Sequence, residues 1–230
     1  MLIIEPSVVV YPFGPVTALK NIERAGRVAY KSEEKMSDTS YVQFIEKIIK
    51  SGHDSVLEHE KLSVKFIVDR GISHELVRHR LASYTQESTR YCNYSQDKFG
   101  GEITVIKPFF FDKERHDMWK NSCEDSEAMY FGLLDNGATP QEARSVLPNS
   151  LKTEVMMTAN MREWRHFFNL RCAREAHPQM RQVAIPLFLF LKNMLFPLFG
   201  DVGYDTDFDP NNYAEVFWYD YGLDNMTKVY

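Results

Sequence analysis

The chain has 230 residues, 44% of them hydrophobic and 13% aromatic, which suffices to bury the core of one or two globular domains. Charged residues of mixed sign at 26%, with only 11 glycines and 10 prolines, exclude a disordered or collagen-like chain. The formal net charge of -5 argues against a general nucleic-acid binder, because duplex affinity depends on a clustered surplus of Lys and Arg.

The N-terminal segment and the cysteines indicate a cytoplasmic protein without a membrane anchor. The first residues lack the basic region and long apolar stretch of a secretion signal. The most apolar stretch, residues 183–191, is followed by Lys192 and is far shorter than the roughly 20 residues of a spanning helix. Cys92, Cys123 and Cys172 lie far apart without a C-x-x-C pair, so we expect reduced thiols.

Hydrophobic periodicity predicts both strands and helices in the first third of the chain. Three valines at 8–10 indicate a strand, and apolar spacing predicts a helix over 18–31. Residues 38–50 repeat apolar side chains at the spacing of an amphipathic helix. Lys61–Asp69 alternates apolar and polar side chains, as a half-buried strand does, and a short helix is expected over 72–80.

The middle of the chain is less regular. Residues 82–95 are polar with almost no apolar periodicity, and a short strand is predicted over 103–106. A long helix is expected over 112–136, closed by an Asn-Gly pair. Thr139 fits a helix N-cap with Glu142 at the third position, so a capping box is expected to open the next short helix.

The last third predicts a strand over 153–158, a helix over 161–173 and a further helix over 178–199, bent at a proline. Strands and helices do not alternate regularly along the chain, which favours an α+β domain over a doubly wound parallel sheet. We predict one domain over residues 1–200, followed by an acidic, aromatic tail over 201–230.

Residues 78–91 are too polar for a core. They contain three arginines, a histidine and several hydroxyl side chains with few apolar atoms, a combination that suits an anion such as phosphate. Composition alone also allows a solvated face, since charged runs usually lie on the surface.

The order of motifs resembles that of flavin-dependent thymidylate synthases. Arg-His-Arg at 78–80, then seven residues, then Ser88 and Arg90-Tyr91 looks like the signature of that family. Blocks at 52–59, 143–148 and 160–171 also match and follow in the family's order. The resemblance covers about residues 15 to 195 and leaves the acidic tail outside.

The resemblance implies an α+β domain with an antiparallel-rich sheet packed by helices, and a homotetramer that binds FAD between subunits. It implies the reductive methylation of dUMP to dTMP, with 5,10-methylenetetrahydrofolate as one-carbon donor, NADPH as reductant and reduced flavin supplying the hydride. The positions that match the family's FAD contacts, with His53 beside them, are Ser55, Arg78, His79, Arg80, Asn160, Arg162 and His166.

The resemblance also assigns the dUMP contacts. Arginine and hydroxyl side chains suit a nucleotide phosphate, which carries nearly two negative charges. Arg171 matches the arginine that activates the uracil, where a fixed guanidinium stabilises the N3-deprotonated ring. The other matching or neighbouring contact positions are Glu75, Gln86, Glu87, Ser88, Thr89, Arg90 and Arg144.

Three features depart from common patterns. Gln86 stands where many relatives have Glu, and it keeps donor and acceptor capacity without the charge. Glu75 stands where glutamine is common, and we expect it to face a ribose hydroxyl or an arginine, since a carboxylate repels phosphate. No G-x-G-x-x-G is present, so the flavin is expected on arginines from several chains rather than in a Rossmann turn.

Two other function classes remain open from the residues alone. His53-Asp54 with the nearby His59 suggests a metal phosphohydrolase, although no histidine pair has the i, i+4 spacing of a helical zinc site, and we expect no metal. The arginines of 78–90, with Tyr84 and Tyr91 as stacking partners, suggest a nucleic-acid-binding module.

The net charge is segregated along the chain. Residues 201–224 hold seven acids and no Lys or Arg, so removing them from the net charge of -5 leaves +2 for the remainder. Residues 142–181 hold seven Lys or Arg against four Glu. These basic segments suit small phosphorylated ligands, and we expect the acidic tail to lie away from them.

Overall fold

A computed structural model describes residues 1–96, 100–221 and 225–230, so the tail acid Asp224 lies outside the described residues. Internal contacts divide the chain into two compact units. The first unit comprises residues 1–7, 66–78 and 85–155, and the second comprises residues 8–65, 79–84 and 156–230.

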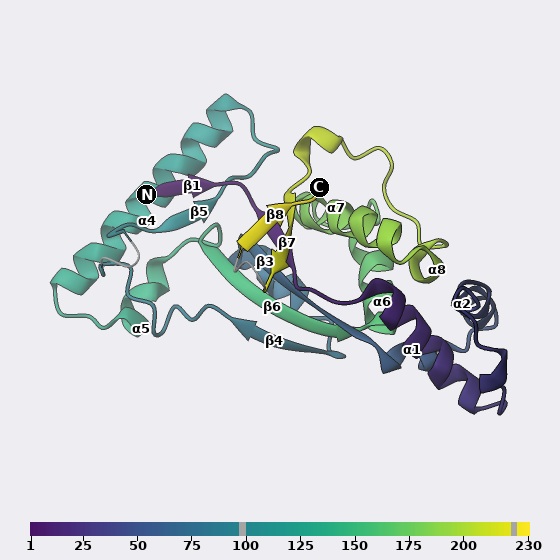
Figure 1. The fold of residues 1–230 in the computed structure, drawn as a ribbon. Helices are drawn as coiled ribbons and strands as arrows, with labels where there is room; N and C mark the ends of the chain where they lie inside the picture. Colours follow the sequence, from purple (N-terminus) through teal and green to yellow (C-terminus); the bar gives the residue numbers. More distant parts are fainter. Residues whose placement is uncertain (97–99, 222–224) are drawn as a thin grey trace. The chain divides into compact units, whose positions relative to one another are not determined.

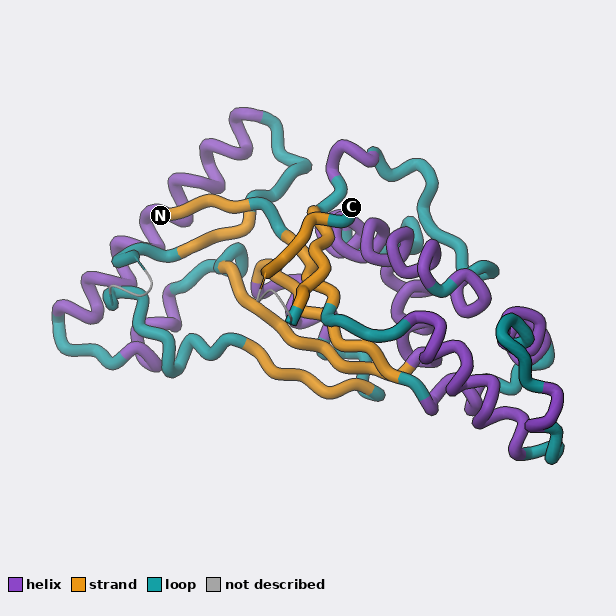
Figure 2. Tube along the Cα trace, in the orientation of Figure 1, coloured by secondary structure: helices purple, strands orange, loops and turns teal. Residues whose placement is uncertain are grey.

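The strands form two sheets; Figure 2 colours the strands orange, and Figure 1 labels all of them except β2. The strands are β1 (Leu2–Ile4), β2 (Ser7–Val10), β3 (Lys61–Asp69), β4 (Ala82–Gln86), β5 (Thr104–Ile106), β6 (Lys152–Asn160), β7 (Glu215–Asp220) and β8 (Asn225–Lys228). One sheet has the order β4-β6-β3-β2-β7-β8, and β1 pairs with β5 in parallel in the other. Helices accompany a sheet of mostly antiparallel strands, so the predicted α+β class is confirmed.

Helices occur in both units. The α-helices are α1 (Pro15–Val28), α2 (Tyr41–Lys50), α3 (Arg70–Leu76), α4 (Lys113–Asp135), α5 (Pro140–Ala143), α6 (Met161–Arg171), α7 (Pro178–Met194) and α8 (Phe196–Phe199). Short 3-10 helices are η1 (Glu33–Lys35), η2 (Asp54–His59), η4 (Arg144–Val146) and η5 (Pro210–Asn212). Within the described part of the chain, none of the helices has both the length and the apolar character needed to cross a bilayer.

The two longest strands alternate between buried and partly exposed side chains. In β3, Leu62, Val64 and Phe66 are at most 2% exposed, while the residues between them reach solvent. In β6, Val155 and Met157 are buried with the same period. Successive side chains of a strand point to opposite faces, so the alternation read from the sequence of 61–69 is confirmed as one buried face.

The first unit has its own hydrophobic core around α4 and the β1–β5 pair. Ile103, Val105 and Leu151 are buried together with Cys123 and Tyr130 of α4. Burial raises the pKa of the Cys123 thiol to about 11, because the thiolate would lose its hydration. Cys123 is therefore a neutral packing residue in this core.

The second unit is packed by aromatic side chains of α6, α7 and α8. Trp164, Phe167 and Phe168 of α6 are fully buried, and the ring of Phe168 contacts Phe188 and Phe199 at centroid distances of 5.3 and 5.4 Å. Aromatic pairs at such separations stabilise a core beyond the area they bury. This packing fixes the helix that carries the candidate site.

Most predicted elements are present with shifted ends. The helices expected over 18–31 and 38–50 are α1 and α2, and the strand expected over Lys61–Asp69 is β3 without change. The side chain of Glu142 accepts the backbone N–H of Thr139 at 2.8 Å, as the predicted capping box requires.

The prediction of one helix over 178–199 is wrong. The helix breaks at Leu195, whose φ of -127° and ψ of 40° are not helical, and the chain continues as α8. Pro197 lies in the first turn of α8, where its missing N–H needs no partner, whereas inside a longer helix it would remove a hydrogen bond. Pro186, by contrast, lies inside α7.

Four strands escape the sequence prediction, namely β1, β4, β7 and β8. None of the residues of β4 is buried, so the segment lacks the apolar face by which periodicity identifies a strand. In the tail, β7 and β8 pair antiparallel, with Phe217 opposite Lys228 and Asp220 opposite Asn225. The side chains of β8 are all exposed, and strand pairing rather than burial holds it.

The expectation that the acidic tail lies away from the basic helices is wrong. Three of its acids pair with arginines of the segment 142–181. Asp201 lies 2.7 Å from Arg165, Asp207 lies 3.4 Å from Arg174, and Asp205 pairs with Arg181. Opposite charges in one folded unit attract, and the net charge of a segment does not show which charge meets which.

Candidate functional site

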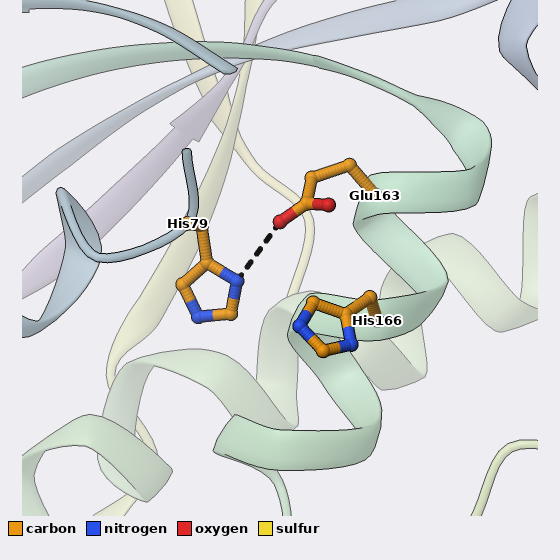
Figure 3. A group of neighbouring side chains, drawn as sticks. All are labelled: His79, Glu163 and His166. Atoms are coloured by element: carbon orange, nitrogen blue, oxygen red, sulfur yellow. Dashed lines mark hydrogen bonds and ion pairs between the residues drawn. The ribbon is translucent and has the colours of Figure 1, made fainter. Parts of the chain in front are cut away.

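His79 is the centre of a polar cluster in the second unit. Its imidazole is almost fully buried, with 4% of the residue exposed. Nδ1 lies 3.1 Å from Oε1 of Glu163, and Nε2 accepts a hydrogen bond of 3.0 Å from Nε of Arg171 (Figure 3 shows the pair with Glu163). His166 lies beside them, with its ring centroid 5.6 Å from that of His79.

One helix supplies three of these four residues. Glu163 and His166 are three residues apart on α6, so they share a face of the helix, and Arg171 is its last residue. The helix begins where Asn160 accepts the backbone N–H of Glu163 at 2.9 Å, which is the usual contact of an N-cap. The sequence of the block 160–171 therefore places the cluster through ordinary helix geometry.

His79 is uncharged at neutral pH. Burial, together with repulsion of a second positive charge by the neighbouring Arg171 and His166, lowers its pKa to about 4. Burial raises the pKa of the Glu163 carboxyl, while His166 and Arg162 oppose that rise. The contact between His79 and Glu163 is therefore a hydrogen bond from a neutral imidazole rather than an ion pair.

The backbone and ring of His79 are also held. The hydroxyl of Tyr84 donates to the carbonyl oxygen of His79 at 2.8 Å. The ring of Phe167 meets the imidazole edge to face at a centroid distance of 5.0 Å. Burial raises the pKa of Tyr84, so the phenol stays protonated and remains a donor.

His79, Glu163 and His166 also have the chemistry of metal ligands. Among the residues that the structure describes, they form the one group of His, Cys, Asp and Glu whose ligand atoms all lie within 4.8 Å of one another. His53 and His59, which suggested a metal site in the sequence, are not members of this group. The guanidinium of Arg171, hydrogen-bonded to the same imidazole, disfavours a divalent cation by repulsion.

The remaining residues that match FAD contacts are exposed, except for the half-buried Asn160. In the second unit, His53 precedes η2, Ser55 lies on η2, and Arg162 lies on α6. η2 packs against α6. Arg162 donates to Glu58 of η2 at 2.6 Å, so this arginine already has an anionic partner. Arg78 and Arg80 are exposed on either side of His79 in the sequence.

The first unit contains a polar cavity of about 250 Å³. Two of the residues assigned to dUMP line it, Thr89 and Arg144, and Nη1 of Arg144 donates to Oγ1 of Thr89 at 3.4 Å. The cavity is also lined by Arg70 and His74, which the sequence did not predict as site residues. The other lining residues are Ser145, Leu147, Pro148, Asn149 and Leu151.

The segment after β4 is anchored within the first unit. Nε2 of Gln86 donates to Ser73 at 3.0 Å and to Thr153 at 3.2 Å. The carboxylate of Glu87 pairs with Lys152 at 2.9 Å. Gln86 and Glu87 thus hold the backbone that leads to Thr89. Their residue types are compatible with this role but do not predict it.

Arg90 and Ser88 lie at the outer end of that segment. Nε of Arg90 donates to Gln141 at 3.1 Å, and the backbone N–H of Arg90 donates to the Ser88 hydroxyl at 3.3 Å. Arg90 is exposed. Glu75 is half-buried on α3.

The structure thus groups the predicted residues into sets. Within the second unit, it brings His79 together with His166 and Arg171, and it adds Glu163, which the sequence did not single out. Glu163 could have been found from its place three residues after the N-cap Asn160 and three before His166. Arg70 could have been found only by folding, because nothing in its sequence context indicates a cavity.

Comparison with known proteins identifies a family match over most of the chain. The family described as thymidylate synthase complementing protein matches residues 16–195. A protein of Geobacter sulfurreducens named flavin-dependent thymidylate synthase is 34% identical over 190 residues, which are 78% of this chain and 79% of that protein.

Two further relatives carry the same name. The protein of Pyrococcus furiosus is 31% identical over 174 residues, covering 75% of this chain and 71% of its own length. The protein of Corynebacterium aurimucosum is 30% identical over 198 residues, covering 78% of each chain. The extent of these matches agrees with the resemblance seen in the four sequence blocks.

Proposed function

The chain belongs to the thymidylate synthase complementing protein family, and we propose that it is a flavin-dependent thymidylate synthase that methylates dUMP to dTMP. The family match over residues 16–195 carries this proposal. The one-carbon donor is 5,10-methylenetetrahydrofolate and the reductant is NADPH. FAD, when bound and reduced, supplies the hydride.

The cavity of the first unit is the proposed site of the dUMP phosphate. Arg70 and Arg144 bring two permanent positive charges to it, and the Thr89 hydroxyl adds a hydrogen-bonding group. A guanidinium binds a phosphate through two parallel N–H groups, which makes arginine well suited to this ligand. Arg144 would exchange its long contact with Thr89 for the phosphate.

The FAD residues divide into pyrophosphate and ring contacts. Arg78, Arg80 and Arg162 are exposed cations that fit a pyrophosphate, and Arg162 would leave Glu58 to bind it. Both nitrogens of His79 already have protein partners, so we assign the contact with the isoalloxazine to the exposed His166. His53, Ser55 and Asn160 complete the proposed set.

The proposal includes a homotetramer in the cytoplasm. The family resemblance implies that FAD lies between subunits, so the arginines assigned to the pyrophosphate would come from more than one copy of the chain. The cysteines Cys92, Cys123 and Cys172 are free thiols, which suits a reducing compartment.

Spectroscopy and isotope release test the proposed function together. The purified protein should be yellow, should bleach when NADPH is added, and should release tritium from C5-labelled dUMP when methylenetetrahydrofolate is present. A protein that stays colourless and inert with added FAD would contradict the proposal. Release of inorganic phosphate from dUMP that chelators abolish, with no need for flavin, would favour the metal phosphohydrolase.

A further inference from the structure

We infer that Glu163 is a positioning residue of this enzyme: by accepting the Nδ1–H of His79, it fixes the tautomer through which His79 holds the guanidinium of Arg171. The inference rests on the proposed function, in which Arg171 activates the uracil. It gives a role to a buried carboxylate that does not line the proposed phosphate cavity.

The hydrogen-bonding capacity of arginine determines which nitrogen of His79 carries the proton. A guanidinium has N–H donors and no acceptor. Because Nε of Arg171 lies 3.0 Å from Nε2 of His79, that nitrogen must present its lone pair. A neutral imidazole has one N–H, which is then on Nδ1 and points at Oε1 of Glu163, 3.1 Å away.

The other tautomer would place two mismatched contacts in a dry site. An Nε2–H would face the N–H of Arg171, and the lone pair of Nδ1 would face a carboxylate oxygen. His79 is 4% exposed and Glu163 is 6% exposed, so water has little access to relieve either contact. Glu163 therefore selects one tautomer, as carboxylates behind functional histidines commonly do.

Glu163 is itself fixed in place. Its backbone N–H is bound by the Asn160 side chain at the start of α6, and the neighbouring Trp164 is fully buried with its indole N–H donating to Leu62. On the other side, Tyr84 holds the carbonyl of His79. The line from Glu163 through His79 to Arg171 is thus supported at Glu163 and at His79.

The consequence is a defined orientation of the guanidinium. A hydrogen bond at Nε fixes the plane of the group, since the three nitrogens of a guanidinium are coplanar. Stabilisation of a developing charge depends on donors that are held in position before the reaction. Loss of Glu163 should therefore lower kcat, whereas the KM for dUMP should change little because other residues hold the phosphate.

Two substitutions at 163 separate positioning from packing. Glu163→Leu keeps the side-chain bulk and removes the acceptor, and we expect kcat to fall by about 10- to 100-fold. Glu163→Gln keeps a carbonyl oxygen that accepts Nδ1–H, so it should retain turnover within a few-fold of wild type. Glu175→Gln removes a carboxylate from an exposed position four residues after Arg171 and serves as the control with unchanged turnover.

Nitrogen NMR of histidine-labelled protein provides a readout independent of turnover. The signals of His79 are identified by their loss in His79→Gln, and the wild-type holoenzyme should show a protonated Nδ1 and an unprotonated Nε2. This measurement needs no substrate, so it applies even if Glu163→Leu fails to fold. A wild-type His79 protonated at Nε2, or a folded Glu163→Leu with unchanged kcat, would overturn the role of Glu163.

The two proposals fail in different ways. Wild-type protein that releases no tritium contradicts the proposed function. Wild-type protein that is active but carries the Nε2–H tautomer contradicts only the inference about Glu163.

Discussion

Burial and fixed partners determine the chemistry of His79. In water a histidine exchanges its proton near neutral pH and changes tautomer freely, whereas this side chain is kept neutral with both nitrogens bound. The flanking arginines at 78 and 80 are exposed. Three adjacent residues of one motif therefore have two different environments. His79 makes rigid contacts in the interior, whereas Arg78 and Arg80 are exposed and available to a charged ligand.

The low pKa of His79 predicts a loss of stability in mild acid. The folded protein binds this proton with a pKa of about 4, and the unfolded chain binds it near 6.5. Between these values the unfolded chain binds more protons, so the free energy of unfolding decreases as pH falls from about 6.5 to about 4. The total effect is about 3 kcal/mol at most.

Urea unfolding of flavin-free protein across this pH range measures that loss. His79→Gln keeps a donor and an acceptor but cannot titrate, so the difference in stability between wild type and variant should change by the predicted amount between pH 7 and pH 4. A difference that is independent of pH would show that His79 is not a buried neutral base.

Arg171 and Arg90 should differ in the step they affect. Arg171→Ala is expected to keep FAD and to lower kcat at least about 100-fold, because the group acts on the reacting ring. Arg90→Ala should raise the KM for dUMP about tenfold, as the loss of one charge-assisted phosphate contact would. Steady-state kinetics with flavin quantification checks both, and equal loss of flavin in the two variants would refute this division.

At the scale of elements, α6 determines the geometry of the candidate site. Its buried face holds Trp164, Phe167 and Phe168 in the core, and its start and end carry Asn160 and Arg171. A helix held rigidly by aromatic packing gives Glu163, His166 and Arg171 fixed separations, which a loop would not.

The cap of α6 can be tested apart from flavin binding. Asn160→Ala removes the acceptor for the Glu163 N–H and should cost about 1 kcal/mol of stability in flavin-free protein. Asn160→Asp keeps an N-cap acceptor and should cost little. If thermal unfolding of the flavin-free alanine variant matches wild type, the side chain of Asn160 serves only the flavin.

The tail segment 201–209 is held to α7 and to the connection between α6 and α7 by ion pairs of unequal burial. The side chains of Asp205 and Arg181 are 5% and 16% exposed, while those of Asp207 and Arg174 are both 75% exposed. Removing one charge of a buried pair leaves its partner uncompensated, whereas an exposed pair is screened by water.

These two pairs form a matched test of the tail's attachment. Asp205→Asn should lower the free energy of unfolding by about 3 kcal/mol, because Arg181 would keep its charge without a carboxylate. Asp207→Asn, the control at an exposed pair, should cause no measurable change. Urea titration of both variants measures these free energies of unfolding. Equal losses of stability in the two variants would mean that the burial of the Asp205–Arg181 pair has no energetic consequence.

At the scale of the whole molecule, flavin binding should depend on assembly. If FAD lies between subunits of a homotetramer, dilution should release it, since a separated chain keeps only part of the binding site. Gel filtration with detection at flavin and protein wavelengths should show a falling flavin-to-protein ratio as the assembly dissociates. A monomer that keeps a full complement of FAD would contradict the tetrameric site.

Local pattern was enough to predict most helices and the buried strand β3. Their apolar side chains recur with the period of the element, so the sequence of 61–69 or 38–50 contains the information that folding uses. The family motifs likewise lead to the prediction that particular arginines and histidines bind the ligands, because ligand chemistry constrains residue type at fixed spacing.

Tertiary structure alone decided what has no local signal. β4 and β8 lack a buried face and exist as strands because neighbouring strands pair with them. The pairing of tail acids with Arg165, Arg174 and Arg181, and the placing of Glu163 against His79, join residues distant in sequence. The order of predicted strands and helices determined the α+β class and the sequence blocks determined the family, but the protonation state of His79 depends on burial and partners that only the folded chain brings together.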